Sequence, residues 1–94
     1  MKEVKSMSDL LEIASNVRKS FGLNVSAMTL RAFDKCEVSL LCDTASEALE
    51  QQLQENGYRL VGEVRSGSET LRNYEKDSDG VKVIILLKQK EGGE

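Results

Sequence analysis

The sequence predicts a small α+β domain in which two helices cover one face of an antiparallel sheet. Segments with apolar residues at helical spacing alternate with segments in which every second residue is apolar, and together they predict the order α-β-β-α-β-β-β. The chain has no proline and no internal repeat, so nothing marks a boundary between domains. At 94 residues it has room for one core. We therefore expect a single domain over residues 1–90, with residues 91–94 as a polar tail that frays.

The first helix is predicted to begin after Ser6 and to end before Gly22. Ser6 and Asp9 have the spacing of a capping box, in which each side chain accepts a hydrogen bond from the backbone N–H of the other. Gly22 supplies the left-handed residue at which many helices end. A short strand over residues 2–5 is expected before the helix. The apolar residues of the helix recur at three or four positions: Met7, Leu10, Leu11, Ala14, Val17 and Phe21.

A hairpin is predicted next, because the apolar period changes to two, with a turn at Asp34 and Lys35. Cys36 and Cys42 share one face of its second strand and would lie about 20 Å apart, too far for a disulfide. We expect both thiols to be reduced and buried as small apolar side chains, with a redox or metal-binding role as the alternative. The residues expected to face the core are Met28, Leu30, Ala32, Cys36, Val38, Leu40 and Cys42.

The second half of the chain is predicted to form one helix and a three-strand meander. A capping box at residues 44–47 begins the helix, and Asn56 and Gly57 end it. Strands are expected at residues 58–64, 71–76 and 81–88, with turns at 66–68 and 77–80. Both faces of the last strand carry apolar residues, so we expect it at the centre of the sheet. The inward residues of the helix are predicted to be Ala45, Ala48, Leu49 and Leu53.

The charge of the chain argues against two classes of partner. Sixteen acidic against thirteen basic residues give a net charge of −3, so no positive field attracts nucleic acid or anionic lipid. No apolar run is long enough to span a membrane, and no signal-type segment follows Met1, so we expect a cytoplasmic protein. The outward face of the predicted second helix is acidic, with no basic residue among its members, and is either a solvated face or a surface for a basic partner: Asp43, Glu47, Glu50 and Glu55.

The sequence contains no histidine, the commonest general acid or base and the commonest metal ligand in proteins. No pair of the remaining reactive residues has the spacing of a catalytic site, so we expect neither enzyme activity nor a cofactor. Residues 75–80 resemble the start of an EF-hand loop, but the position that needs a carboxylate is Leu86. A hairpin turn rich in Asp and Gly accounts for this segment, so no metal site is expected.

Residues 10–64 resemble ACT domains, which are small amino-acid-sensing regulatory modules with a ferredoxin-like βαββαβ fold. Leu10 to Ala14 and Phe21 to Val25 are similar to the first helix of that family and its turn into the second strand, and Ala45 to Tyr58 is similar to the second helix and the Gly-aromatic pair that ends it. The resemblance implies a ferredoxin-like sheet, or a permuted variant in which the last strand replaces the first. It also implies a small ligand at a subunit interface, near Ser6, Ser8 and Asp9 of one chain and Gly22 and Asn24 of a neighbour.

The sheet face without helices is the expected surface for self-association, because two helices can cover only one side. On the last strand this face reads Lys82, Ile84, Leu86 and Lys88, which is apolar in the middle and charged at the ends. We expect these residues to form a homodimer interface. The expected function is therefore a non-enzymatic binding or regulatory module. The alternative is a small inhibitor or adaptor that binds a protein partner through its acidic surface.

Overall fold

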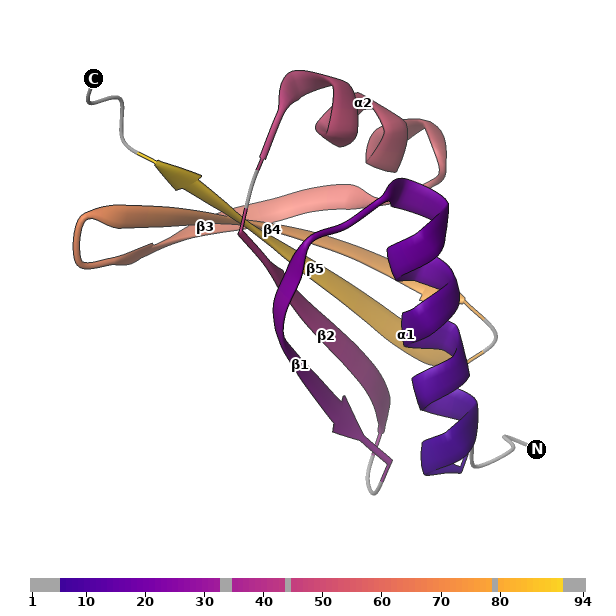
Figure 1. Ribbon diagram of the computed structural model, residues 1–94. Helices are drawn as coiled ribbons and strands as arrows, with labels where there is room; N and C mark the ends of the chain where they lie inside the picture. Colours follow the sequence, from indigo (N-terminus) through magenta and orange to yellow (C-terminus); the bar gives the residue numbers. More distant parts are fainter. Residues whose placement is uncertain (1–5, 33–34, 44, 79, 91–94) are drawn as a thin grey trace.

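The computed structural model describes residues 6–32, 35–43, 45–78 and 80–90. The predicted strand at 2–5, Asp34 of the hairpin turn and the tail at 91–94 lie outside these residues. No described helix is long and apolar enough to cross a membrane. The helix-first order is confirmed (Figure 1), with α1 at Met7–Phe21, β1 at Val25–Arg31, β2 at Cys36–Cys42, α2 at Glu47–Glu55, β3 at Arg59–Ser66, β4 at Glu69–Ser78 and β5 at Val81–Lys90.

The five strands form one mixed sheet in the order β1-β2-β5-β4-β3. β2 and β5 run parallel, with Cys36 beside Val81 and Cys42 beside Leu87, whereas the other neighbouring strands are antiparallel. The prediction of an antiparallel sheet is therefore wrong at this pair. Two parallel strands must be joined by a long connection that returns the chain to the end of the sheet at which the first strand begins. Between β2 and β5, the segment from α2 to β4 is this connection. The predicted central position of the last strand is confirmed.

α1 begins and ends as predicted. The Ser6 hydroxyl accepts a hydrogen bond from the Asp9 N–H at 3.2 Å, and the Asp9 carboxylate accepts one from the Ser6 N–H at 3.1 Å. Gly22 ends the helix in the left-handed conformation, with φ of 62°. These short-range interactions depend on local sequence alone, so the sequence pattern was sufficient to place both ends.

α2 begins later than predicted. Its N-cap is Ser46, whose hydroxyl accepts a hydrogen bond from the Leu49 N–H at 3.1 Å, and residue 44 lies outside the described residues. A helix of nine residues presents only a narrow stripe to the core. Leu53 is therefore fully buried and Leu49 is partly buried, whereas Ala48, which was predicted to face inward, is exposed.

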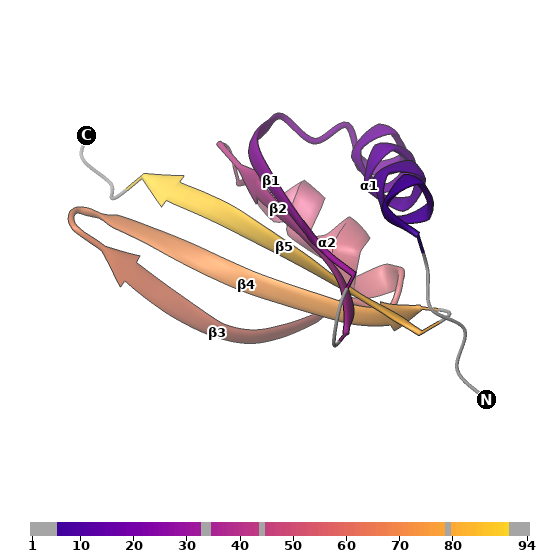
Figure 2. The ribbon, with the colours of Figure 1, turned by 90° about the horizontal axis from the view of Figure 1, so that it is seen from below.

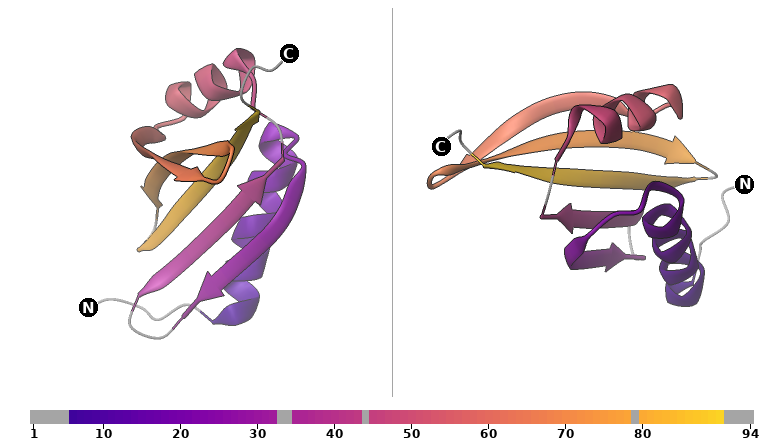
Figure 3. Two further views of the ribbon diagram at one scale, coloured as in Figure 1. Left: turned by 90° about the vertical axis from the view of Figure 1, so that its left-hand side faces the viewer. Right: turned by 45° about the horizontal axis from the view of Figure 1, so that its top comes forward.

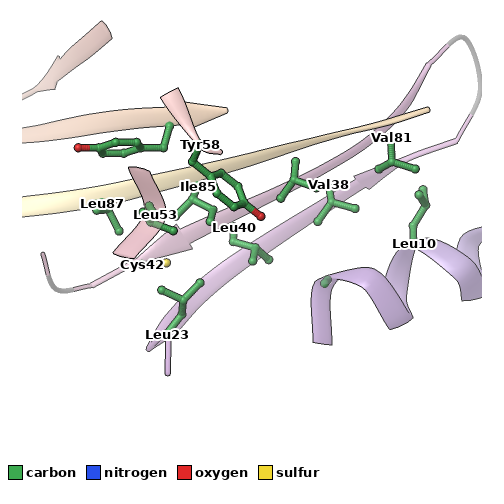
Figure 4. Packing of buried hydrophobic residues seen from close by; sticks show 13 residues of the cluster. Leu10, Leu23, Val38, Leu40, Cys42, Leu53, Tyr58, Val81, Ile85 and Leu87 are labelled. Carbon is green, nitrogen blue, oxygen red and sulfur yellow. The ribbon is translucent and has the colours of Figure 1, made fainter. Parts of the chain in front are cut away.

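Both helices and one face of the sheet contribute to a single hydrophobic core (Figure 4). α1 contributes Leu10 and Ala14, and α2 contributes Leu53. Along β5, buried residues alternate with half-buried ones, and the buried set is Val81, Val83, Ile85 and Leu87. We call the side of the sheet that carries this set the core face and the opposite side the second face.

β3 and β4 form a long hairpin at one edge of the twisted sheet (Figures 2 and 3). A β-bulge between Leu60 and Gly62 interrupts the alternation predicted for β3. Leu60 therefore lies beside Tyr74 on the core face, whereas Gly62 and Val64 lie on the second face. β4 is longer than the predicted residues 71–76, because its pairing with β5 continues over its whole length.

Candidate functional site

The second face of the sheet carries aliphatic side chains at its centre. Ile84 and Leu86 of β5 are half-buried, and the strand register places Leu41 of β2 beside Leu86. On the other side of β5, Leu71 of β4 lies beside Lys88, and Val64 of β3 lies beside Leu71. We call this set the aliphatic strip: Leu41, Val64, Leu71, Ile84 and Leu86.

Ion pairs surround the aliphatic strip. Lys82 Nζ lies 3.6 Å from the Glu75 carboxylate, and Lys88 Nζ lies 3.6 Å from Asp43 and 3.9 Å from Glu69. Cations and anions therefore occur together around one apolar patch. A surface of this kind is complementary to a rotated copy of itself, which is the requirement for a two-fold interface.

The residues predicted for a homodimer interface form only the β5 part of this surface. Lys82, Ile84, Leu86 and Lys88 all lie on the second face of β5, as expected. The rest of the aliphatic strip comes from three other strands and was missed. Its positions become neighbours only through the strand order, which no periodicity within one strand reveals.

The residues predicted to bind a small ligand lie at opposite ends of α1. Ser6, Ser8 and Asp9 stand at its start and Gly22 and Asn24 at its end, and a helix of 15 residues separates the two groups by about 22 Å. Ser6 and Asp9 bind each other in the capping box, and the Asn24 carbonyl accepts a hydrogen bond from the backbone N–H of residue 43 at 3.0 Å. One chain does not bring the two groups together, so the ligand site between neighbouring chains stays a prediction.

A polar cluster joins α2 to the edge hairpin on the core-face side. Glu50 Oε1 accepts hydrogen bonds from the Tyr74 hydroxyl at 2.6 Å and from Arg72 Nε at 2.8 Å. Arg72 Nη1 also donates to Glu63 Oε2 at 2.7 Å, and Gln54 Nε2 donates to the Tyr74 hydroxyl at 3.4 Å. The Tyr74 hydroxyl and the Glu50 carboxylate raise the pKa of the Arg72 guanidinium, so Arg72 keeps its charge.

This cluster gives one residue of the predicted acidic surface a basic partner from another element. Arg72, on β4, pairs with Glu50, and their side chains are only 24% and 14% exposed. The donors and acceptors of the cluster bind one another, so we assign it the structural role of holding α2 on the sheet. Within the described ranges, no group of three Cys, Asp or Glu residues could hold a metal ion.

The two cysteines differ in burial. Cys42 is fully buried on the core face, which confirms its prediction, whereas Cys36 is only partly buried and the prediction of a fully shielded thiol is wrong there. Cys36 is the first residue of β2. Burial, followed by the negative charge of Asp43, raises the pKa of the Cys42 thiol to about 11.

The stability of the fold is expected to fall at alkaline pH because of Cys42. Its thiol has an ordinary pKa of 9.0 and a folded pKa of about 11, so between these values the unfolded chain binds fewer protons than the folded one. The free energy of unfolding should therefore decline from about pH 9 to about pH 11, by about 2–3 kcal/mol. Urea unfolding across this range measures the decline, which Cys42→Ala should reduce. Equal declines in the two proteins would assign the effect elsewhere, for example to Tyr58, whose pKa is also raised by burial.

A maleimide reagent is expected to label Cys36 first. Cys36 is partly exposed, whereas Cys42 has no exposed surface and reacts only when the core opens. Mass spectrometry of proteolytic fragments after timed labelling gives the two rates. If both thiols react at the same rate in the native protein, the burial of Cys42 described above is wrong.

No protein-family model, no curated protein and no solved structure matches this chain.

Proposed function

We propose that this chain is a non-enzymatic binding module that forms a symmetric homodimer through the second face of its sheet. The aliphatic strip carries the proposal, because it joins residues of four strands into one patch with ion pairs around it. Single aliphatic residues are common on protein surfaces, whereas a contiguous patch with a charged rim is typical of interfaces. A two-fold axis through the patch places the strip of one copy on the strip of the other.

The proposed dimer rests on a two-layer architecture with both helices on the core face. In support, the buried residues of α1 and α2 share one core with the buried residues of β5. We further propose that the fold is a permuted ferredoxin-like fold. In support, the last strand, β5, lies parallel to β2 at the centre of the sheet, where it replaces the first strand of the unpermuted order.

The second face is close in size to a stable interface. Five strands spaced about 4.8 Å apart, with seven to ten residues each at about 3.3 Å, make a face of roughly 650 Å² in projection. The relief of the side chains brings its accessible area toward the roughly 800 Å² per partner of specific complexes. In the dimer the aliphatic strip would lose its remaining exposure, while the ion pairs would stay at the rim.

An unpaired polar group lies on the second face. The Asn73 Oδ1 is shielded from solvent and accepts no hydrogen bond within the described part of the chain. Asn73 lies between Leu86 and Gly62, in the middle of the second face. A shielded acceptor without a hydrogen bond lowers the free energy of unfolding by about 1–3 kcal/mol.

Light scattering over a dilution series tests the proposal. We expect a mass near twice the 10.4 kDa of the chain at high concentration and a fall toward the monomer mass on dilution. A dissociation constant of about 10 μM, roughly 7 kcal/mol, would leave the protein mostly dimeric at about 100 μM. A monomer at that concentration would contradict the homodimer and leave the alternative, a factor that binds a different protein.

A further inference from the structure

An apolar groove lies between α1 and the edge strand β1. Its volume is about 430 Å³, and the buried Leu40 of β2 contributes to its floor. Leu11 and Met28 remain 50% and 46% exposed at its sides, although both belong to segments that pack on the core. The other lining residues come from one flank of α1 and the start of β1: Ala14, Ser15, Arg18 and Val25.

The groove borders a strand that is free to accept a neighbour. Within the described sheet, β1 is hydrogen-bonded only to β2, so the backbone N–H and C=O groups of its outer edge have no strand partner. A bulge lies between Val25 and Ala27, and the pairing is regular from Ala27 to Arg31. This regular part contains no proline and no charged residue before Arg31, the features that usually prevent edge pairing. An edge strand beside an apolar groove is the geometry by which domains bind extended peptides.

Arg18 places a positive charge at one end of the groove, where it could bind the carboxylate of a peptide. Arg18 is the charged residue of the lining and stands in the last turn of α1, next to the loop that leads into β1. It takes part in none of the ion pairs formed by the described residues. A guanidinium binds a carboxylate through paired hydrogen bonds. A strand added antiparallel to β1 would end beside Val25, on the same side of the groove as Arg18.

We propose that this groove binds the C-terminal segment of a partner protein as a strand antiparallel to β1, with its terminal carboxylate on Arg18. The distance along α1 from Leu11 to Arg18 is about 10 Å, which matches about three extended residues. Two apolar side chains at alternate positions therefore fit the groove. The groove lies on the opposite side of the sheet from the aliphatic strip, so this proposal and the homodimer can fail independently.

Selection from a library of random peptides displayed with free C-termini tests the proposal, with the full chain as bait. We expect enriched sequences to carry aliphatic residues at the last position and two positions before it. A synthetic copy of an enriched peptide should lose about tenfold or more in affinity when its carboxylate is replaced by an amide. N-methylation of a backbone nitrogen that pairs with β1 should have a similar effect, because it removes a hydrogen bond of the added strand.

Two variants of α1 make the test specific. Arg18→Gln should weaken the free-acid peptide about tenfold and leave the amide form unchanged, whereas Lys19→Gln, an exposed neighbour outside the lining, should bind like the wild type. When the peptide is added to the wild-type chain, the changes in amide chemical shift should concentrate at residues 11–18 and 25–31. The proposal is overturned if no sequence is enriched, if the acid and amide bind equally, or if the shifts fall elsewhere. It is also overturned if dilution alone produces the same shifts, because a second copy would then occupy the β1 edge.

Discussion

An Ile84→Lys variant is expected to be a folded monomer at concentrations at which the wild-type chain is a dimer. Ile84 belongs to the aliphatic strip, so the proposed two-fold interface would bury the new ammonium group against the apolar side chains of the second copy. An unpaired charge buried in an interface costs several kcal/mol, so dimerisation should weaken by about 100-fold or more. The monomer should tolerate the change, because position 84 is only half-buried and its strand neighbours Ser39 and Glu75 are polar.

Leu60→Lys provides the matched control for Ile84→Lys. Leu60 is an aliphatic residue of β3 that is 40% exposed, and it lies on the core-face side, away from the aliphatic strip. This variant should remain a dimer. Sedimentation equilibrium of both variants and the wild type, with circular dichroism to confirm folding, gives the comparison. A folded Ile84→Lys protein that dimerises like the wild type would exclude the second face as the interface.

An Arg72→Met variant is expected to lose about 2–3 kcal/mol of stability. Methionine keeps much of the apolar volume of the side chain, but Glu50 then keeps its charge in a largely shielded position without its cation. Removing one partner of a fully buried ion pair lowers the stability by about 3–5 kcal/mol, and the partial exposure of this pair reduces the loss. Urea unfolding of the single variants Arg72→Met and Glu50→Gln and of the double variant measures the coupling, which we expect to be about 1–2 kcal/mol.

Lys82→Met serves as the control for Arg72→Met. Lys82 also pairs with a carboxylate from the neighbouring strand, but its distance to Glu75 is 3.6 Å and its side chain is 39% exposed. A pair of this kind contributes about 0–1 kcal/mol. Losses of the same size in the two variants would show that the polar cluster does not hold α2 on the sheet.

The sequence alone determined the elements whose signals are local. The capping box at Ser6 and the left-handed Gly22 gave both ends of α1, because each of these interactions joins residues a few positions apart. The apolar residues on both faces of residues 81–88 correctly predicted a central strand. Of the candidate interface, only the residues of β5 were predictable, since they belong to one alternating segment.

The tertiary structure decided every relation between distant segments. Strand periodicity states which side chains share a face but not which strand lies beside it, so the parallel pairing of β2 with β5 had no local signal. That pairing, with the antiparallel addition of β4 and β3, brought Leu41 and Leu71 beside β5 and Val64 beside Leu71. Arg72 met Glu50 for the same reason, because their separation of 22 residues is closed only when α2 packs over β4. Contacts of this kind depend on the free energy of the whole packed core, which no short window of sequence contains.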